Sequence, residues 1–103
     1  MGPSAASKAN VVQGTSRVLS EEVAFDRARV TSTWLSYPIL DITKAPEEVD
    51  IVLINRPDLP PAGAGESSIR PVAAALANAV FDASGVRLRR APLTPERLKP
   101  ALA

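Results

Sequence analysis

The spacing of hydrophobic positions predicts a helix near the start of the chain. Between residues 11 and 22 the apolar side chains approximate one helical face, with Val11, Val12, Val18 and Leu19. Gly14 interrupts this pattern at a cost of ~1 kcal/mol against alanine, so we expect it to mark a close approach to another backbone or to a ligand. Residues 1–9 are small and polar without a period, and are expected to be disordered or to form the frayed start of this helix.

Several later stretches have the composition of β-strands. Residues 23–25 and 30–34 are expected to pair as a β-hairpin around a turn at 26–29. Residues 49–55 present two mostly apolar faces, so this strand is expected to be covered on both sides. A final strand is predicted at 86–90, where arginines alternate in part with apolar residues.

An alanine-rich helix is predicted over residues 69–84, and it is apolar nearly all round, which is typical of a buried helix. Pro71 suits its first turn, because the N–H that proline lacks has no helical partner there. Ser67 or Ser68 is expected to cap its unpaired N–H groups. Gly85 is expected to end it in the left-handed conformation.

The predicted fold is therefore α+β, a small mixed sheet with a β-hairpin and two to three helices, the last a short one with Thr94 as its cap and Pro95 in its first turn. Among its 103 residues the chain has two Phe, one Tyr and one Trp. A core built mainly from alanine and valine is thin, because aromatic side chains bury ~150–250 Å² each. This composition suits one piece packed against something larger.

Charge and residue content exclude several classes of function. The net charge of +1 produces no global field that would favour nucleic acid or an anionic membrane. No apolar run reaches the ~18 residues that a membrane span needs. Without cysteine or histidine the chain has no disulfide, no thiolate metal site and no histidine acid–base pair. Its carboxylates are scattered over predicted turns and polar faces, so no metal-ligand set is predicted.

Glu66 is the candidate catalytic residue, because it ends the small-sided loop 60–66 just before the alanine-rich helix. A carboxylate near a helix N-terminus is stabilised as the anion by ~0.3–1 kcal/mol. The plainer alternative is a proline- and glycine-rich connector with one solvated glutamate. Gly63-Ala64-Gly65 matches neither the dinucleotide fingerprint nor the P-loop. The chain offers no partner acid or base, so catalysis by Glu66 requires a group supplied from elsewhere.

Several runs of residues carry a specific likeness to a known family. They are Val12-Gln13-Gly14, Glu21-Glu22-Val23-Ala24-Phe25-Asp26, Ser36-Tyr37-Pro38-Ile39-Leu40, Pro60 to Glu66, Pro71 to Gly85, and Leu93-Thr94-Pro95-Glu96-Arg97. With them, residues 10–103 resemble the C-terminal portion of the molybdopterin-binding subunit of the xanthine dehydrogenase/aldehyde oxidase family. The likeness is to the branch of isoquinoline 1-oxidoreductase and nicotinate dehydrogenase large subunits, and residues 1–9 lie outside it.

The resemblance implies a role for the loop that ends at Glu66. In this family the corresponding glutamate lies beside the molybdenum of a molybdopterin cofactor and acts as general base on the metal-bound hydroxide. Gly63, Ala64 and Gly65 would then lie adjacent to the cofactor. The implied substrate is a small aldehyde or N-heterocycle, and the implied partners are the rest of the molybdenum subunit and an iron–sulfur subunit that carries electrons away.

The chain also departs from the family's pattern. The family's subunit is several times longer, and a cofactor-contacting Gln-x-Glu-Gly run is replaced here by Ala6-Ser7-Lys8-Ala9. We therefore expect a fragment of a larger cofactor-binding domain that is inactive and free of molybdenum when isolated. The alternative is a non-catalytic truncated remnant or an interaction fragment. The expected location is cytoplasmic by default, with the periplasm as the alternative if a missing segment or partner carries an export signal.

Overall fold

The computed structural model describes residues 2–103, and its regular elements are helices. The α-helices are α1 (Pro3–Leu19), α2 (Val72–Ser84) and α3 (Pro95–Leu98). Three short 3₁₀ helices are η1 (Ile42–Lys44), η2 (Glu66–Ile69) and η3 (Lys99–Ala101). Within the described residues no helix is both long and apolar enough to cross a membrane.

The first helix starts earlier than the hydrophobic pattern predicted. Residues 3–9 form the first turns of α1, and alanine there has the highest intrinsic helix propensity. Met1, which belongs to the segment predicted to be disordered or to form the frayed start of the helix, lies outside the described residues. Near the other end Arg17 occupies the last turn, where a cation interacts favourably with the negative end of the helix.

The predicted α+β fold with a small mixed sheet and a β-hairpin is wrong. Over residues 2–103 the chain forms no strand, and a single isolated antiparallel bridge joins Phe25 to Val30. The turn itself is present, because Asp26 Oδ1 accepts hydrogen bonds from the N–H groups of Ala28 at 2.8 Å and Arg29 at 2.9 Å. This Asx-type turn needs only local residues, whereas a ladder needs two arms that stay side by side.

Side-chain hydroxyl groups stop the ladder beyond that bridge. The Ala24 N–H donates to Ser32 Oγ at 2.8 Å instead of to a facing backbone carbonyl. One residue further, the Thr33 N–H donates to Ser36 Oγ at 2.8 Å, and the Tyr37 N–H donates to the Thr33 carbonyl at 2.9 Å. The second arm therefore curls into a turn of its own, which is the competition that serine and threonine offer to regular structure.

The strands predicted at 49–55 and 86–90 are also absent from the described residues. Residues 49–55 have no regular secondary structure and no other segment forms a ladder with them, and Val52 and Ile54 are 87% and 82% exposed. A strand sequence becomes a strand only when a neighbouring strand accepts its N–H and C=O groups. The predicted cover on both sides is wrong, because the face of Val52 and Ile54 is open, and on the other face Val49 and Ile51 are only half-buried.

Packing concentrates where α1 crosses η2 and the start of α2. Among the residues whose burial is described, the buried apolar side chains are Val18 of α1, Val72 of α2 and Pro92, and the buried polar ones are Thr15 and Ser16. Thr15 satisfies its hydroxyl by donating to the Val11 carbonyl one turn earlier at 2.8 Å. This small centre confirms the expectation of a thin core.

Gly14 confirms the expected close approach and identifies the neighbour. A Cβ added at Gly14 would lie 2.9 Å from both Cβ and Cγ1 of Val72. Real Cβ atoms do not come that close, so only glycine lets α1 meet the first residue of α2 at this distance. The neighbour is a valine side chain, rather than another backbone or a ligand.

The ends of α2 agree with the sequence prediction in part. Gly85 adopts the left-handed conformation with φ of 72° and donates its N–H to the Phe81 carbonyl, as predicted. At the other end Pro71 is the N-cap residue, and no side chain caps the helix. The predicted capping by Ser67 or Ser68 is wrong, because both serines lie within η2, and Arg70 and Pro71 separate that short helix from α2.

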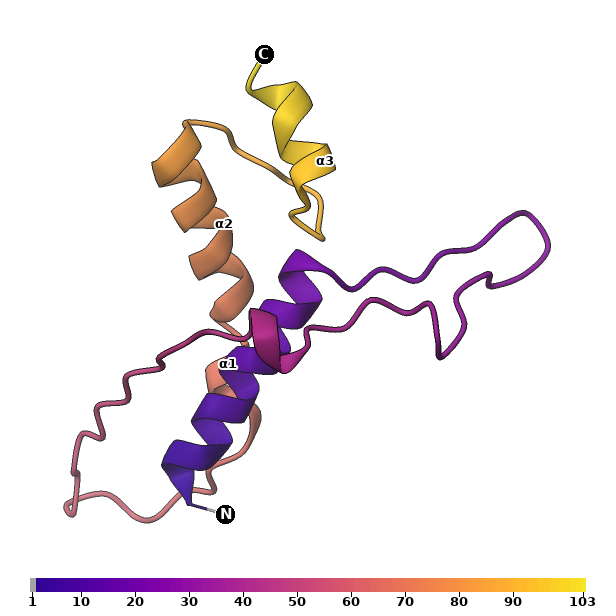
Figure 1. Ribbon diagram of the computed structural model, residues 1–103. Helices are drawn as coiled ribbons and strands as arrows, with labels where there is room; N and C mark the ends of the chain where they lie inside the picture. Colours follow the sequence, from indigo (N-terminus) through magenta and orange to yellow (C-terminus); the bar gives the residue numbers. More distant parts are fainter. Residues whose placement is uncertain (1) are drawn as a thin grey trace.

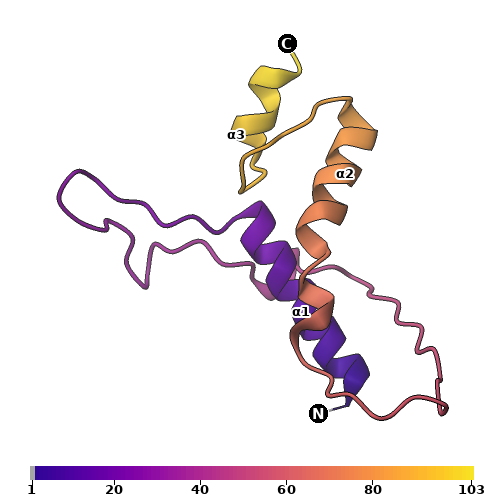
Figure 2. The same ribbon diagram turned by 180° about the vertical axis from the view of Figure 1, so that it is seen from behind.

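Two long excursions project from this helical centre. Residues 20–41 form an arm on one side of α1, and residues 45–65 form a wide loop on the other, as both views show (Figures 1 and 2). The solvent-accessible surface is 8379 Å², against about 5,500 Å² for a folded monomer of this mass. The radius of gyration is 16.8 Å, against about 13 Å. The chain therefore leaves much of its surface uncovered.

Candidate functional site

Glu66 begins η2 and is exposed, as are all the residues of the loop 60–66 before it. It belongs to the short 3₁₀ turn rather than to the first turn of α2, so the end of a long helix does not adjoin it directly. In the part of the chain that the structure describes, no arginine or lysine forms an ion pair with its carboxylate. The Glu66 carboxylate is therefore accessible to a group from outside the described residues.

Asn10 ties the glycine loop to α1. Its side-chain Nδ2 donates to the Gly65 carbonyl at 2.7 Å and to Ser68 Oγ at 3.1 Å. These two bonds bracket Glu66, which lies between the residues that they hold. The sequence analysis did not single out Asn10, although it is the first residue of the stretch that resembles the molybdenum subunit.

The glycines of the loop face open space. A Cβ added at Gly63 or at Gly65 would meet no atom within 4 Å, in contrast to the crowded Gly14. The described residues also contain no group of three or more acidic, histidine or cysteine side chains that could hold a metal ion. A large anionic cofactor needs several converging donors. By themselves Gly63, Ala64, Gly65 and Glu66 therefore do not fit such a cofactor, and other segments would have to hold it.

An apolar hollow of about 290 Å³ lies beside this loop, where α1 faces the start of α2. Its lining is mostly aliphatic, from Val11, Thr15, Ser68, Pro71, Val72, Ala75 and Leu76. Ser68 connects the hollow to the Asn10 contact. The hollow is apolar and holds no acid or base, so its chemistry suits the packing of another apolar group.

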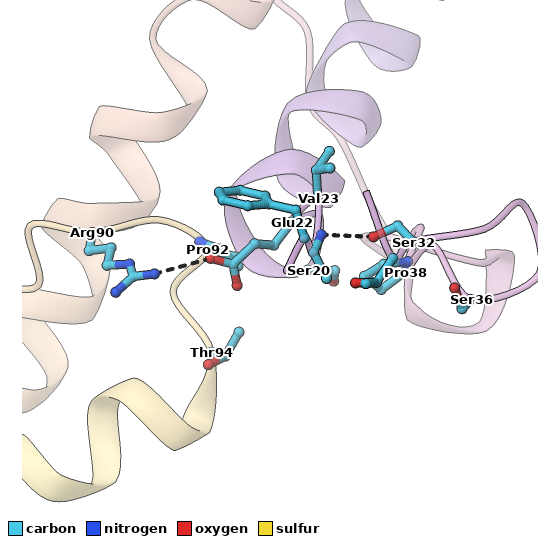
Figure 3. Close-up of a pocket in the computed structure, with 12 residues that line it drawn as sticks. Ser20, Glu22, Val23, Ser32, Ser36, Pro38, Arg90, Pro92 and Thr94 are labelled. Carbon is cyan, nitrogen blue, oxygen red and sulfur yellow. Dashed lines mark hydrogen bonds and ion pairs between the residues drawn. The ribbon is translucent and has the colours of Figure 1, made fainter. Parts of the chain in front are cut away.

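A second hollow, of about 570 Å³, lies away from Glu66, between the end of α1 and the segment before α3 (Figure 3). Glu22 is the acidic residue of its lining, and its two carboxylate oxygens accept from Arg97 Nη2 at 2.6 and 2.8 Å. Arg90 Nη2 approaches the same carboxylate at 3.4 Å. The hydrogen bond from Arg97 holds the pKa of Glu22 below its ordinary value.

These contacts attach the C-terminal segment to α1. Arg97 also donates from Nη1 to the Pro92 carbonyl at 2.8 Å, and the Leu93 N–H donates to the Val18 carbonyl at 2.7 Å. Because arginine engages both oxygens of Glu22, this carboxylate has a structural role and is not a candidate catalytic group. The one carboxylate that lines the hollow in Figure 3 is therefore paired with arginine.

Glu21 organises the base of the arm in a similar way. Ser16, which is 5% exposed, donates to Glu21 Oε1 at 2.5 Å and accepts from the Leu40 N–H at 2.9 Å. Tyr37 donates its hydroxyl to Glu21 Oε2 at 3.0 Å, and this bond raises the pKa of Tyr37. The arm thus leaves and rejoins α1 at the same place, held by one serine and one carboxylate.

Comparisons with curated proteins identify two relatives. The chain is 49% identical over 94 residues to one subunit of the nicotinate dehydrogenase of Pseudomonas putida, a match that covers 90% of this chain and 8% of that protein. It is 35% identical over 96 residues to an aldehyde oxidoreductase of Megalodesulfovibrio gigas, covering 89% of this chain and 10% of that protein. No protein-family model matches the chain, and no solved structure matches it.

The chain is therefore similar to a short segment of each of two oxidoreductases. The likeness to nicotinate dehydrogenase and to aldehyde-oxidising enzymes that the sequence runs indicated is confirmed by their names. The chain spans a tenth or less of the length of each relative, 8% of one and 10% of the other. The assignment to a C-terminal portion of that subunit, and the division into residues 1–9 and 10–103, stay predictions.

Proposed function

We propose that this chain is one segment of the molybdenum-binding subunit of an oxidoreductase of the xanthine dehydrogenase/aldehyde oxidase family. The observation that carries the proposal is 49% identity over 94 residues to a dehydrogenase subunit of which the chain covers 8%. The segment works only together with the rest of that subunit, which would hold the molybdopterin cofactor. An iron–sulfur subunit would take the electrons, and the substrate would be a small aldehyde or N-heterocycle.

The open surface of the chain supports this proposal. No side chain in the described residues is fully buried, and the large apolar residues exposed beyond the core include Trp34 at 98% and Leu35 at 101%. A stable monomer rarely leaves so much apolar surface in water, because burial of each square ångström of apolar surface contributes about 25 cal/mol to the free energy of folding. The remaining nine-tenths of the subunit would supply the cover.

Glu66 is the general base in this proposal. The acidic residues Glu21 and Glu22, which belong to the same family-like runs, are engaged by Ser16, Tyr37 and Arg97. Glu66 differs from them because, within the described residues, neither a side-chain hydrogen bond nor an ion pair engages its carboxylate. The redox chemistry belongs to the cofactor that other segments would bind, and the contribution of this chain is a carboxylate oxygen that accepts a proton.

The test is Glu66→Gln in the assembled enzyme, with cofactor content measured beside turnover. We expect turnover to fall by ~10²–10⁴-fold, since loss of a general base costs about that much, while the cofactor stays bound. Glu47→Gln is the matched control, because Glu47 is an exposed glutamate elsewhere on the chain, and it should leave turnover unchanged. Turnover near that of the wild type in Glu66→Gln would remove Glu66 from the mechanism.

The exposed apolar side chains also favour a second candidate function, a non-catalytic interaction fragment. Trp34 and Leu35 stand on a turn that is held by reciprocal hydrogen bonds between Thr33 and Ser36. A rigid, exposed aromatic residue is a common anchor at protein interfaces. Neighbouring genes that encode the rest of the subunit would support the enzyme segment, and their absence would support the interaction fragment.

A further inference from the structure

Asn10 offers the loop before η2 a tertiary anchor that the glycines themselves lack. The loop 60–65 is exposed along its length, and neither Gly63 nor Gly65 has a neighbour that would contact a Cβ. Glycine-rich backbone loses much conformational freedom when it is ordered. A hydrogen bond at the last residue of the loop therefore determines where the following side chain, Glu66, begins.

The geometry at Asn10 specifies an amide. One nitrogen donates both bonds, at 2.7 Å to the Gly65 carbonyl and at 3.1 Å to Ser68 Oγ. A carbonyl oxygen accepts only, so the group facing Gly65 must be the NH₂ of the amide. An aspartate of the same shape would place an acceptor against an acceptor, and an alanine would leave the carbonyl to water.

We infer that Asn10 is a positioning residue that sets the place of Glu66 by holding Gly65 and Ser68 on either side of it. This inference rests on the proposed function, in which Glu66 accepts a proton. Asn10 does not touch the reacting atoms. It links α1, which is packed against α2 through Gly14 and Val72, to the loop whose glutamate must be held in register with groups on other segments. Small displacements of such a group reduce the rate steeply.

The first experiment measures the loop without relying on catalysis. The chain has no cysteine, so Ser67→Cys, which lies between Glu66 and Ser68 and is exposed, takes a single spin label in the full chain. We expect Asn10→Ala and Asn10→Asp to increase the mobility of the label. Lys8→Ala, an exposed position on the same helix, should leave it unchanged. Equal mobility in all four proteins would overturn the anchoring role.

The second experiment measures turnover of the assembled enzyme with the native Ser67. Asn10→Ala and Asn10→Asp are expected to lower kcat about 10- to 100-fold while KM changes by about twofold or less, because an interaction that positions the base acts in the transition state. Ser68→Ala keeps the hydrogen bond from Asn10 to the Gly65 carbonyl, so kcat should fall less in this variant than in the Asn10 variants. A change in KM alone, or wild-type kcat in both Asn10 variants, would overturn the inference.

The two experiments separate failure of the inference from failure of the proposed function. If Glu66→Gln keeps full turnover, Glu66 is not the base and the proposed function fails, whatever the label at position 67 reports. If Glu66→Gln is inactive while the Asn10 variants turn over normally, the proposed function stands and the positioning role is overturned. Label mobility that rises while kcat falls in the same Asn10 variants supports the positioning role.

Discussion

At the scale of single residues, the glycines of this chain have different roles. Gly14 is required by distance, because the crossing of α1 over α2 brings Val72 to 2.9 Å from the place of its missing Cβ. Gly85 is required by conformation, because it ends α2 with a φ of 72°. Gly63 and Gly65 meet neither requirement within this chain, which agrees with a loop whose neighbours are supplied by other segments.

Gly14→Ala is expected to destabilise the chain. Alanine is favoured over glycine in a helix by ~1 kcal/mol, but the added methyl group must push Val72 or part the two helices, and overpacking costs about 1–3 kcal/mol. We expect a net loss in the free energy of unfolding, measured by denaturant titration with circular dichroism. Gly63→Ala, which has open space around it, is the control and should change little.

The double variant tests the cause. Gly14→Ala combined with Val72→Ala removes the side chain that the new methyl group would meet, so part of the loss should be recovered relative to the sum of the single variants. Additive effects of the two substitutions, or an increase in stability from Gly14→Ala alone, would contradict the close-packed crossing.

At the scale of elements, carboxylates attach the two peripheral segments to α1. Glu21 holds the arm through Ser16 and Tyr37, and Glu22 holds the C-terminal segment through Arg97. These adjacent residues lie just past the end of α1, where the chain turns outward. The family-like run Glu21-Glu22 therefore has a structural role that explains both of its acidic positions.

Attachment of α3 is expected to weaken in acid. The pKa of Glu22 is held below its ordinary value of 4.5 by the hydrogen bond from Arg97, so the folded state favours the ionised form. Its contribution to stability is therefore fully present above about pH 4.5 and is lost as the pH falls through the lowered value. Hydrogen exchange of amides in residues 93–98, followed from neutral to acidic pH, should show this loss.

Glu22→Gln supplies the comparison for that measurement. The variant lacks the charge, so the amides of residues 93–98 should be less protected from exchange at neutral pH than in the wild type. Their protection should also change less between pH 6 and about pH 3. Glu47→Gln, at an exposed position far from Arg97 in the sequence, should behave as the wild type. The same acid response in Glu22→Gln and in the wild type would exclude Glu22 as its source.

At the scale of the whole molecule, the helical centre is small and the excursions are long. Where burial is described, the buried apolar side chains are Val18, Val72 and Pro92, and exposed apolar residues occur on the arm, on the wide loop and on α2. Phe81 of α2 is 40% exposed and has the Arg87 guanidinium over its ring at 4.0 Å. The relatives are about ten times as long or longer. This architecture therefore supports the proposal that the chain is one part of a larger protein, whose other segments would cover it.

The isolated chain is expected to bind a hydrophobic dye and to self-associate. The physical reason is exposed apolar surface on α2 and on the arm, which water disfavours by about 25 cal/mol per Å². Dye fluorescence and sedimentation measure the two effects, and Trp34, the single tryptophan of the chain, should emit as a water-exposed indole in the monomer. A compact monomer that binds no dye would contradict the prediction that other segments cover the apolar surface of this chain.

The sequence by itself determined the features that depend on neighbouring residues. The glycine end of α2, the short helix after Thr94 and the turn at 26–29 were all predicted, because their hydrogen bonds close within a few residues. The glycine at position 14 also predicted a close approach of another part of the chain to this helix, which is Val72. The relation to oxidoreductase segments was readable as well, since it depends on residue identity alone.

The tertiary structure decided the features that depend on a distant partner. The stretches 23–34 and 49–55 have the composition of strands, yet in residues 2–103 they find no neighbouring strand with which to form a ladder. The bonds from Asn10 to Gly65 and from Arg97 to Glu22 join residues 55 and 75 positions apart. A local pattern reports which conformation a segment prefers, whereas pairing and anchoring depend on which other segment the fold brings within about 3 Å.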